Sequence, residues 1–295
     1  MGFLAGLKTI VVATDLGEQS EAALEYARKL AGAYGARIVL AHGVDPLNYA
    51  TVDALPESVL DGLTADARRA LERMSADLIR EGIHSHSEVR QGAVAQMLVD
   101  VAQQYEAGLM VMGTRGMQGA GPVVVGSITE QLVRLASCPV LAVAADWNAG
   151  PHRPVPGGPV LLALEENEAA QAAIETAHSL ASTFERMLVV VHACTFAEAF
   201  NGANPLEEFG IGSNERPPAL FVVADGDPVY AVEQAIARYR PSILVVGVKR
   251  ASDAQGPHGT AFALLARSRV PVLCVPPPAE KITAEEEPCV SAEIA

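Results

Sequence analysis

Short apolar runs alternate along the chain with segments in which apolar residues recur every three or four positions. Together with one polar-alternating stretch, the short runs predict β-strands, and in the first half of the chain these are Thr9–Thr14, Arg37–His42, Ser85–Arg90, Leu109–Met112 and Val140–Val143. The segments between them predict amphipathic helices, which begin at Ser20 and cover Leu63–Glu81, Val94–Tyr105 and Ser127–Ala136. Strands that alternate with helices predict a doubly wound, parallel α/β sheet.

The pattern of the first half returns in the second half. Ile38–His42 resembles Leu188–His192 at a spacing of 150 residues, whereas Met110–Gly113 resembles Leu244–Gly247 at a spacing of 134. The second copy therefore lacks about 16 residues between its second and third strands. Residues 195–220, the least regular stretch of that copy, take the place of the missing helix.

The two copies set the expected domain boundaries. A chain of 295 residues has room for two domains at roughly 150 residues each. We expect one domain over residues 1–147 and a degenerate copy of it over residues 159–278. Glycines and prolines in residues 148–158 predict a linker, and the acidic residues 279–295 predict a disordered tail.

Composition and charge narrow the class of protein. Half of the residues are apolar, and 35 acidic residues outnumber 21 basic ones, which gives a formal net charge of −14. A general affinity for nucleic acid or for an anionic membrane is therefore not expected. No run approaches the ~18 apolar residues of a membrane span, and we expect a cytoplasmic protein.

The four cysteines form no recognisable framework. Cys138, Cys194, Cys274 and Cys289 include no CxxC pair and have no histidine at ligand spacing. Neither a zinc site nor a set of disulfides is predicted, so we expect reduced, buried thiols.

The stretch with the most chemical content is a glycine-rich loop that follows a strand and opens a helix. It reads Gly113-Thr-Arg-Gly116, then nine residues from 117 to 125, then Gly126-Ser127. Glycines let backbone N–H groups turn inward around a phosphate, and a helix N-terminus adds further donors. Taken alone, the loop is equally compatible with a simple turn. No lysine follows a glycine, so the loop is not a Walker A sequence.

The Gly-x2-Gly-x9-Gly-Ser spacing, with Asp15 after the first strand and the closing strand Pro139–Val143, resembles the universal stress protein family in its tandem form. The resemblance covers about residues 9–275. It implies two tandem, open, Rossmann-like sheets, each with five parallel strands in the order 3-2-1-4-5. In the ATP-binding branch it implies an ATP at the strand ends, where the strand order reverses.

The resemblance also implies the role of each residue in the first half. Asp15 would contact the ribose hydroxyls, and Gly43 would offer backbone atoms to the adenine edge. Met112 would line the base pocket. The phosphates would be held by Gly113, Gly116, Gly126 and Ser127, with Ile128 beside them. Arg115 either meets the γ-phosphate or faces solvent. Mg²⁺ could bridge the phosphates, although the sequence shows no dedicated carboxylate cage.

The second copy departs from this pattern. Arg250 stands where the first copy has Gly116, and Asp253 adds a negative charge to the loop. Glu165 replaces Asp15 and is long enough to crowd a ribose. We therefore expect the second half not to bind ATP in the manner of the family.

The remaining constellations of polar residues do not predict an enzyme. His42 and His192 occupy matching strand positions, which indicates a shared packing or hydrogen-bonding role. His84 and His86 alternate on one strand and lack a third metal ligand. The serines carry no nucleophile motif, and no candidate base lies near the loop, so any hydrolysis of ATP should be slow.

These observations favour a nucleotide-responsive stress or signalling regulator that acts on a protein partner the sequence does not identify. The alternatives are a nucleotide-independent interaction scaffold and a slow ATPase. In the family, the closing strands pair across a dimer interface. For Val140–Val143 and Val272–Val275 this implies an internal pseudo-dimer of the two halves, and the association of two chains into a homodimer stays open.

Overall fold

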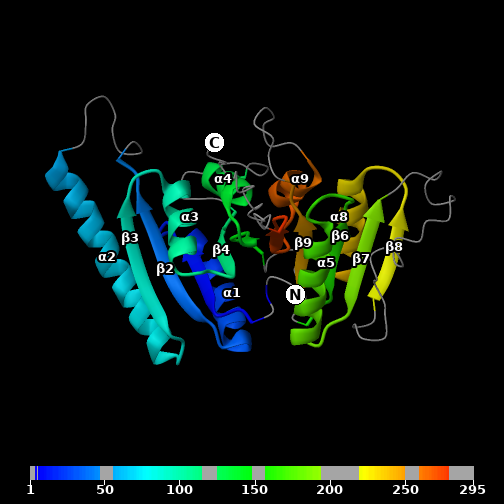
Figure 1. Ribbon diagram of the computed structural model, residues 1–295, viewed down its shortest axis with the longest axis horizontal. Helices are drawn as coiled ribbons and strands as arrows, with labels where there is room; N and C mark the ends of the chain where they lie inside the picture. The colour runs from blue at the N-terminus through cyan, green and yellow to red at the C-terminus, as the bar shows by residue number, and fades with distance from the viewer. Residues whose placement is uncertain are drawn as a thin grey trace, which may run out of the picture.

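The fold is an alternation of strands and helices in both halves of the chain (Figure 1). The computed structural model describes residues 4, 6–46, 56–114, 125–147, 157–193, 219–249 and 259–278. The first half contains β1 (Thr9–Ala13), α1 (Glu18–Tyr34), β2 (Arg37–Val44), α2 (Glu57–Arg80), β3 (Ser85–Gln91), α3 (Val94–Gln104), β4 (Leu109–Gly113), α4 (Ser127–Leu135) and β5 (Val140–Val143). The second contains β6 (Val160–Leu164), α5 (Ala170–Thr183), β7 (Leu188–Ala193), β8 (Ala219–Ala224), α8 (Pro228–Tyr239), β9 (Ile243–Gly247), α9 (Thr260–Arg267) and β10 (Val272–Val275).

Local sequence explains where several of these elements begin and end. All five residues of β1 are buried, as expected of a central strand with both faces covered. Helix α1 ends at Gly35, which takes a φ of +65° that favours glycine. Helix α8 begins after Asp227, whose carboxylate accepts a hydrogen bond of 2.8 Å from the N–H of Tyr230, and Pro228 occupies its first turn.

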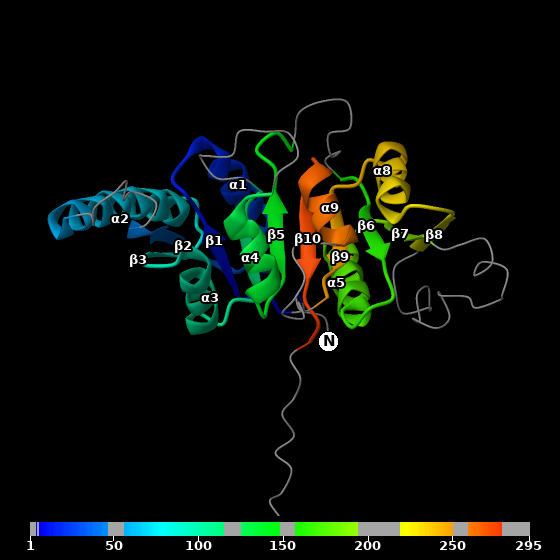
Figure 2. The same cartoon turned by 90° about the horizontal axis from the view of Figure 1, so that it is seen from above.

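The ten strands in the described ranges form one continuous sheet. Their order is β3-β2-β1-β4-β5-β10-β9-β6-β7-β8, so each half has the predicted order 3-2-1-4-5 with parallel neighbours. The two predicted tandem sheets are joined into one, because β5 and β10 pair in antiparallel fashion and place Leu141 opposite Leu273. Figure 2 shows these two strands side by side and pointing in opposite directions at the centre of the molecule. The implied internal pairing of the closing strands is thus present.

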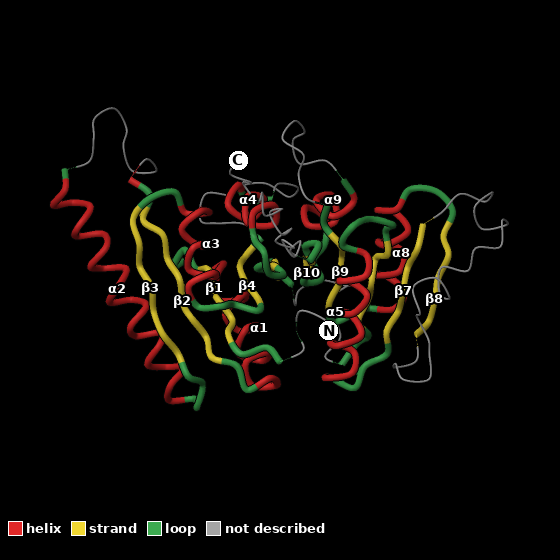
Figure 3. The backbone as a smooth tube through the Cα atoms, in the orientation of Figure 1, coloured by secondary structure: helices red, strands yellow, loops and turns green. Residues whose placement is uncertain are grey.

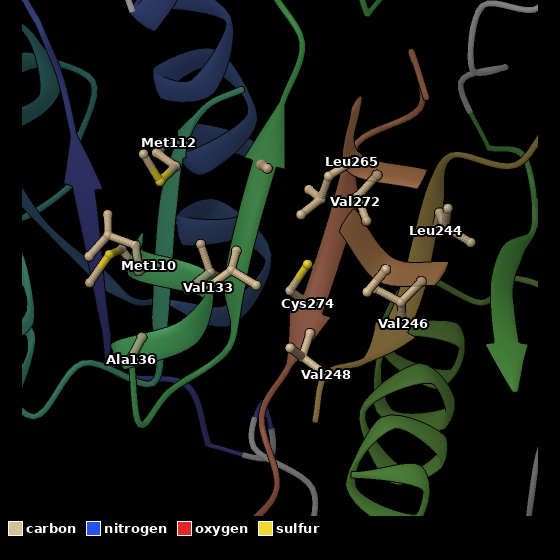
Figure 4. Packing of buried hydrophobic residues seen from close by; sticks show 14 of the residues in the cluster. Met110, Met112, Val133, Ala136, Leu244, Val246, Val248, Leu265, Val272 and Cys274 are labelled. Carbon is tan, nitrogen blue, oxygen red and sulfur yellow. The ribbon is translucent and has the colours of Figure 1, made fainter. Parts of the chain in front are cut away.

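Each face of the sheet carries a hydrophobic core that runs through both halves. Helices α1 and α5 contribute to the core on one face, together with Leu71 and Leu78 of α2. Helices α3, α4, α8 and α9 contribute to the other. In Figure 4, side chains of this second core approach the β5–β10 junction from both sides, among them Val133 of α4, Leu265 of α9 and Cys274 of β10. The two halves therefore pack against each other and are not independent domains connected only by a linker.

The arrangement of helices creates a switch point in the first half. Helix α1 follows β1 and packs on one face, whereas α4 follows β4 and packs on the other. Because β1 and β4 are neighbours, the two connections leave the sheet on opposite sides at the carboxyl ends of these strands. Open α/β sheets bind ligands in the crevice formed at such a point.

The structure changes two of the sequence predictions and leaves others outside the described residues. Helix α2 begins at Glu57, six residues before the predicted Leu63, because its first turn is largely exposed and apolar periodicity reports only the buried face. Leu220, assigned to the irregular segment, lies in β8. Residues 148–156, 194–218 and 279–295 fall outside the described residues, and with them most of the linker, most of the irregular segment and the whole tail.

The two outer edges of the sheet differ. Figure 3 shows the long helix α2 running along β3 at one end of the sheet. At the other end, no helix of the described part of the chain runs along β8 in this way. This difference matches the shorter connection between the second and third strands of the second half.

Candidate functional site

The turn after β1 is held by a chain of hydrogen bonds. The N–H of Leu16 donates to Oγ1 of Thr14 (3.0 Å), which lies 2.7 Å from Oγ of Ser20. That hydroxyl donates in turn to the carbonyl of Gly17 (2.8 Å), so the Thr14 hydroxyl is the donor to Ser20. The φ of Leu16 is +63°, a left-handed conformation that is uncommon for leucine. Backbone strain of this kind persists where the surroundings enforce it, often at ligand sites.

Asp15 is oriented by this turn. Its Oδ1 accepts a hydrogen bond of 3.0 Å from the N–H of Gly17, and its side chain is half-buried at the carboxyl end of β1. The carboxylate is therefore held beside the switch point in one orientation. The predicted contact of Asp15 with a ribose stays a prediction.

A histidine ties β2 to the same turn. Nδ1 of His42 lies 2.8 Å from the carbonyl oxygen of Thr14. Because a carbonyl only accepts, the proton is on Nδ1. Nδ1 of His192 makes the corresponding bond to the carbonyl oxygen of Leu164, at 3.1 Å. The predicted shared hydrogen-bonding role of the two histidines is confirmed.

Gly43 on β2 and Met112 on β4 pack against neighbouring helices. A Cβ on Gly43 would come within 2.7 Å of Cε of Met97 and 3.0 Å of the methyls of Val94, so this glycine lets α3 pack closely on β2. Met112 is buried in the core shared with α3 and α4, and Figure 4 shows it on β4 beside β5. The structure gives both residues a packing role, in addition to the predicted contacts with a base.

The glycine-rich loop is closed at its base by two hydrogen bonds. The N–H of Gly126 donates to the carbonyl of Thr114 (2.9 Å), and the hydroxyl of Thr129 donates to the carbonyl of Gly113 (3.1 Å). These bonds bring the end of β4 against the start of α4 across twelve residues of sequence. Arg115 and Gly116, two predicted phosphate contacts, lie outside the described residues.

The N-terminus of α4 offers amide donors at this point. Its N-cap is Gly126, and no side chain caps the helix. The first N–H groups of a helix have no partner inside it, and the helix dipole makes them attractive to an anion. Since the N–H of Gly126 already bonds to Thr114, the donors nearest the helix start are those of Ser127, which is exposed, and Ile128, which is half-buried.

The corresponding place in the second half carries contacts between its own side chains. Nζ of Lys249 lies 2.9 Å from Oε1 of Glu165, the residue that matches Asp15. Oδ1 of Asn167 accepts a hydrogen bond from the N–H of Ala169 (2.8 Å). The same oxygen would lie 3.2 Å from a Cβ added to Gly247, the residue that matches Gly113. The predicted departure of this half rests on Arg250, Asp253 and Glu165. Arg250 and Asp253 lie outside the described residues, and the contacts of Lys249 and Asn167 were not predicted from the sequence.

Other candidate groups have structural explanations. Nε2 of His86 lies 3.5 Å from a carboxylate oxygen of Glu88, and His84 is exposed. Within the described ranges, no three histidine, cysteine or carboxylate groups are placed to hold a metal. Cys138 and Cys274 are free and buried. Burial raises the pKa of the Cys138 thiol to about 11 and that of Cys274 further, so both stay protonated at neutral pH.

No helix in the described part of the chain is long and apolar enough to cross a membrane.

Comparisons with known proteins agree with the fold. A model of the universal stress protein family matches residues 6–144. A universal stress protein of Mycolicibacterium smegmatis is 31% identical over 189 residues, which are 62% of this chain and span 63% of that relative. One from Methanocaldococcus jannaschii is 30% identical over 138 residues, 46% of this chain and 81% of that relative. The crystal structure of a universal stress protein from Archaeoglobus fulgidus superposes with a TM-score of 0.74 at 18% identity, covering 91% of this chain and 98% of the other. At that identity the likeness concerns the fold alone.

Proposed function

Since this chain belongs to the universal stress protein family, we propose that its first half binds ATP at the carboxyl ends of β1 and β4. One observation carries the proposal. At the switch point, the oriented carboxylate of Asp15 lies at the end of one strand, and the uncapped N-terminus of α4 follows the neighbouring strand. A carboxylate suits the hydroxyls of a ribose, and helix amides suit phosphate oxygens.

Each part of the nucleotide has a proposed contact. The ribose lies at Asp15, and the base lies toward Gly43 and Met112. The phosphates lie between the loop glycines Gly113 and Gly116 and the amides of Ser127 and Ile128. Gly126 contributes by closing the loop rather than by donating to the ligand, because its N–H is engaged by Thr114. Arg115 is proposed to reach the γ-phosphate.

Backbone donors suit the charge of this protein. A chain with 35 acidic and 21 basic residues repels a triphosphate at long range, so its phosphate site depends on donors at short range. Because the described residues contain no cluster of metal ligands, Mg²⁺ is proposed to arrive bound to the phosphates and not to a protein cage.

The proposed activity is binding that changes the state of a partner protein, with little turnover. The described residues at the switch point include Asp15 and His42, and both are tied to the turn after β1 by hydrogen bonds. Neither is placed as a base for an attacking water in the manner of efficient ATPases. We expect ATP hydrolysis to stay below ~1 per second, the low end of ordinary enzymes.

A matched pair of variants tests the site. Asp15→Ala in the first half and Glu165→Ala in the second remove carboxylates at corresponding positions. In calorimetric titrations with Mg-ATP, we expect one site per chain in the native protein. Asp15→Ala should weaken binding roughly tenfold, as expected for loss of a charged hydrogen-bond acceptor, and Glu165→Ala should leave it unchanged.

A second variant tests the loop. Gly116→Glu places a negative side chain where the phosphates are proposed to lie and should abolish binding. Two results would overturn the proposal: no ATP binding by the native protein, or undiminished binding by both Asp15→Ala and Gly116→Glu. Equal losses from Asp15→Ala and Glu165→Ala would mean that the two halves do not differ as proposed.

A further inference from the structure

A pocket of about 280 Å³ lies between the two halves, and no residue of the proposed ATP site lines it. The first half supplies α1 and Trp147, and the second half supplies the start of β6, the start of β9 and the end of α5. Its volume is near the lower end of the ~300–1,000 Å³ that is usual for small-molecule sites. The pocket is thus large enough for a small ligand and is formed only because the halves pack together.

The interior of this pocket is apolar, and its polar groups are already engaged. Leu30, Val160, Leu180 and Ile243 contribute aliphatic walls. The hydroxyl of Tyr26 donates to the carbonyl of Ser242 (3.1 Å). Oγ of Ser242 in turn lies 3.0 Å from the carbonyl of Gly158. A sugar would find these two hydroxyls already engaged, whereas a hydrocarbon chain needs no polar partner.

Two cationic side chains line the same pocket. Nζ of Lys29 lies 5.1 Å from the centre of the Trp147 ring and 2.7 Å from a carboxylate oxygen of Glu25. Arg186 is exposed and packs against Gly157, where an added Cβ would come within 3.2 Å of its guanidinium carbon. Within the described residues no carboxylate pairs with Arg186. Arg186 thus places a cationic group that has no carboxylate partner among the described residues at the edge of an apolar pocket.

We propose that this pocket binds a medium-chain aliphatic carboxylate, with its chain between the halves and its carboxylate at Arg186 and Lys29. The apolar walls select the chain, and the guanidinium matches the geometry of a carboxylate. A ligand of this kind contacts both halves at once, so it stabilises the junction through binding linkage. The site is independent of ATP binding at the switch point.

The tryptophan content of the chain provides a direct readout. Trp147 is the single tryptophan among 295 residues, and its ring packs edge-on against Tyr26 within the pocket. Titration of the full-length protein with decanoate, below the concentration at which decanoate aggregates, should shift Trp147 emission to saturation at one ligand per chain. A 2-bromodecanoate should quench the emission, whereas decanoate should not, because the carboxylate is placed at Lys29, whose Nζ lies 5.1 Å from the centre of the Trp147 ring, and bromine quenches only when it lies near the indole ring.

Two arginine variants separate this site from general effects of charge. Arg186→Glu should weaken decanoate binding roughly tenfold or more, the scale of a lost charged hydrogen bond. Arg68→Glu on α2, also exposed, changes the net charge equally and should have no effect. Both variants should bind Mg-ATP as the native protein does, which distinguishes failure of this proposal from failure of the ATP site.

Three results would overturn the inference. The first is an emission unchanged by decanoate. The second is equal binding of decanoate and neutral decanol together with an unaffected Arg186→Glu, which would mean that the pocket takes apolar molecules without regard to charge. The third is equal weakening by Arg186→Glu and Arg68→Glu, which would assign the effect to net charge.

Discussion

The two halves share a backbone plan and differ at the carboxyl ends of their strands. In the first half, Asp15 bonds to the amide of Gly17 at the start of α1. In the second half, Asn167 stands at the position of Gly17 and its side chain lies close to Gly247, while Glu165 pairs with Lys249. The described side chains that distinguish the two halves therefore lie at the strand ends, where the proposed ATP site of the first half is placed.

The largest effect is expected at the β5–β10 junction, where the two halves pack against each other. Leu273 of β10 is 1% exposed and lies opposite Leu141 of β5. Leu273→Ala should lower the free energy of unfolding by about 2–5 kcal/mol, the usual range for a leucine removed from a core. In urea unfolding, far-ultraviolet circular dichroism and Trp147 emission should shift together, because one core spans the junction.

The control for that experiment is Leu135→Ala on α4, where the leucine is 51% exposed. It should change the unfolding free energy by no more than about 0.5 kcal/mol. Separate transitions in the Leu273→Ala variant, one shifted and one not, would mean that the halves unfold independently.

The second largest effect is expected at Gly43, which lets α3 pack closely on β2 in the first half. Position 43 is glycine, whereas the matching residue of the second half is Ala193. Gly43→Ala should cost about 1–3 kcal/mol through overpacking, at the lower end because Met97 Cε is the end of a flexible chain. Thermal or urea unfolding measures the cost. The effects of Gly43→Ala and Met97→Ala on the unfolding free energy should not add, because Met97→Ala removes the group that the new methyl meets. The second half has this combination already: Ala231 stands at the position that matches Met97 and leaves room for the methyl of Ala193. Strict additivity would contradict the packing account.

The two histidines allow a matched test of stability against ligand binding. His42→Phe and His192→Phe each remove a hydrogen bond to a carbonyl at the end of the first strand of their half. Each should cost about 1 kcal/mol of stability. Only His42→Phe should weaken ATP binding in calorimetry, because Asp15 follows the carbonyl that His42 holds. Equal effects of both variants on ATP affinity would remove the distinction between the halves.

The Lys249–Glu165 ion pair should contribute least to stability. Lys249 and Glu165 have side chains that are 63% and 41% exposed, and exposed pairs stabilise proteins by about 0–1 kcal/mol. Lys249→Met should therefore change the unfolding free energy by less than about 0.5 kcal/mol, with an effect that shrinks as salt is added. A large, salt-independent loss would show that the pair is more than a surface contact.

Much of the fold was predictable because its signals are local. Buried strands such as β1 and β5 appear in the sequence as short apolar runs, and the order 3-2-1-4-5 follows from the family resemblance. The joining of the halves into one sheet was anticipated only as a pairing of the closing strands. The start of α2 was not predictable from periodicity, since Glu57 and its neighbours form an exposed first turn.

The positions of the candidate site residues along the chain could be predicted from the sequence, whereas the hydrogen bonds and ion pairs around them could not. The positions of Asp15, Gly113 and Ser127 at strand and helix ends follow from spacing. The engagement of the Gly126 amide by Thr114 and the pairing of Glu165 with Lys249 arise from contacts between distant segments, for which the sequence has no periodic signal. The pocket at Trp147 draws residues from both halves, so no single motif marks it.

The antiparallel pair of β5 and β10 has a consequence for how this protein responds to its environment. A partner that is covalently attached is present at a fixed effective concentration, so the contact between the halves does not weaken when the protein is scarce. The sequences of the two halves can therefore diverge at the strand ends as long as both keep the shared cores. Because the two halves belong to one chain, their assembly does not depend on the protein concentration, even though the halves are no longer identical.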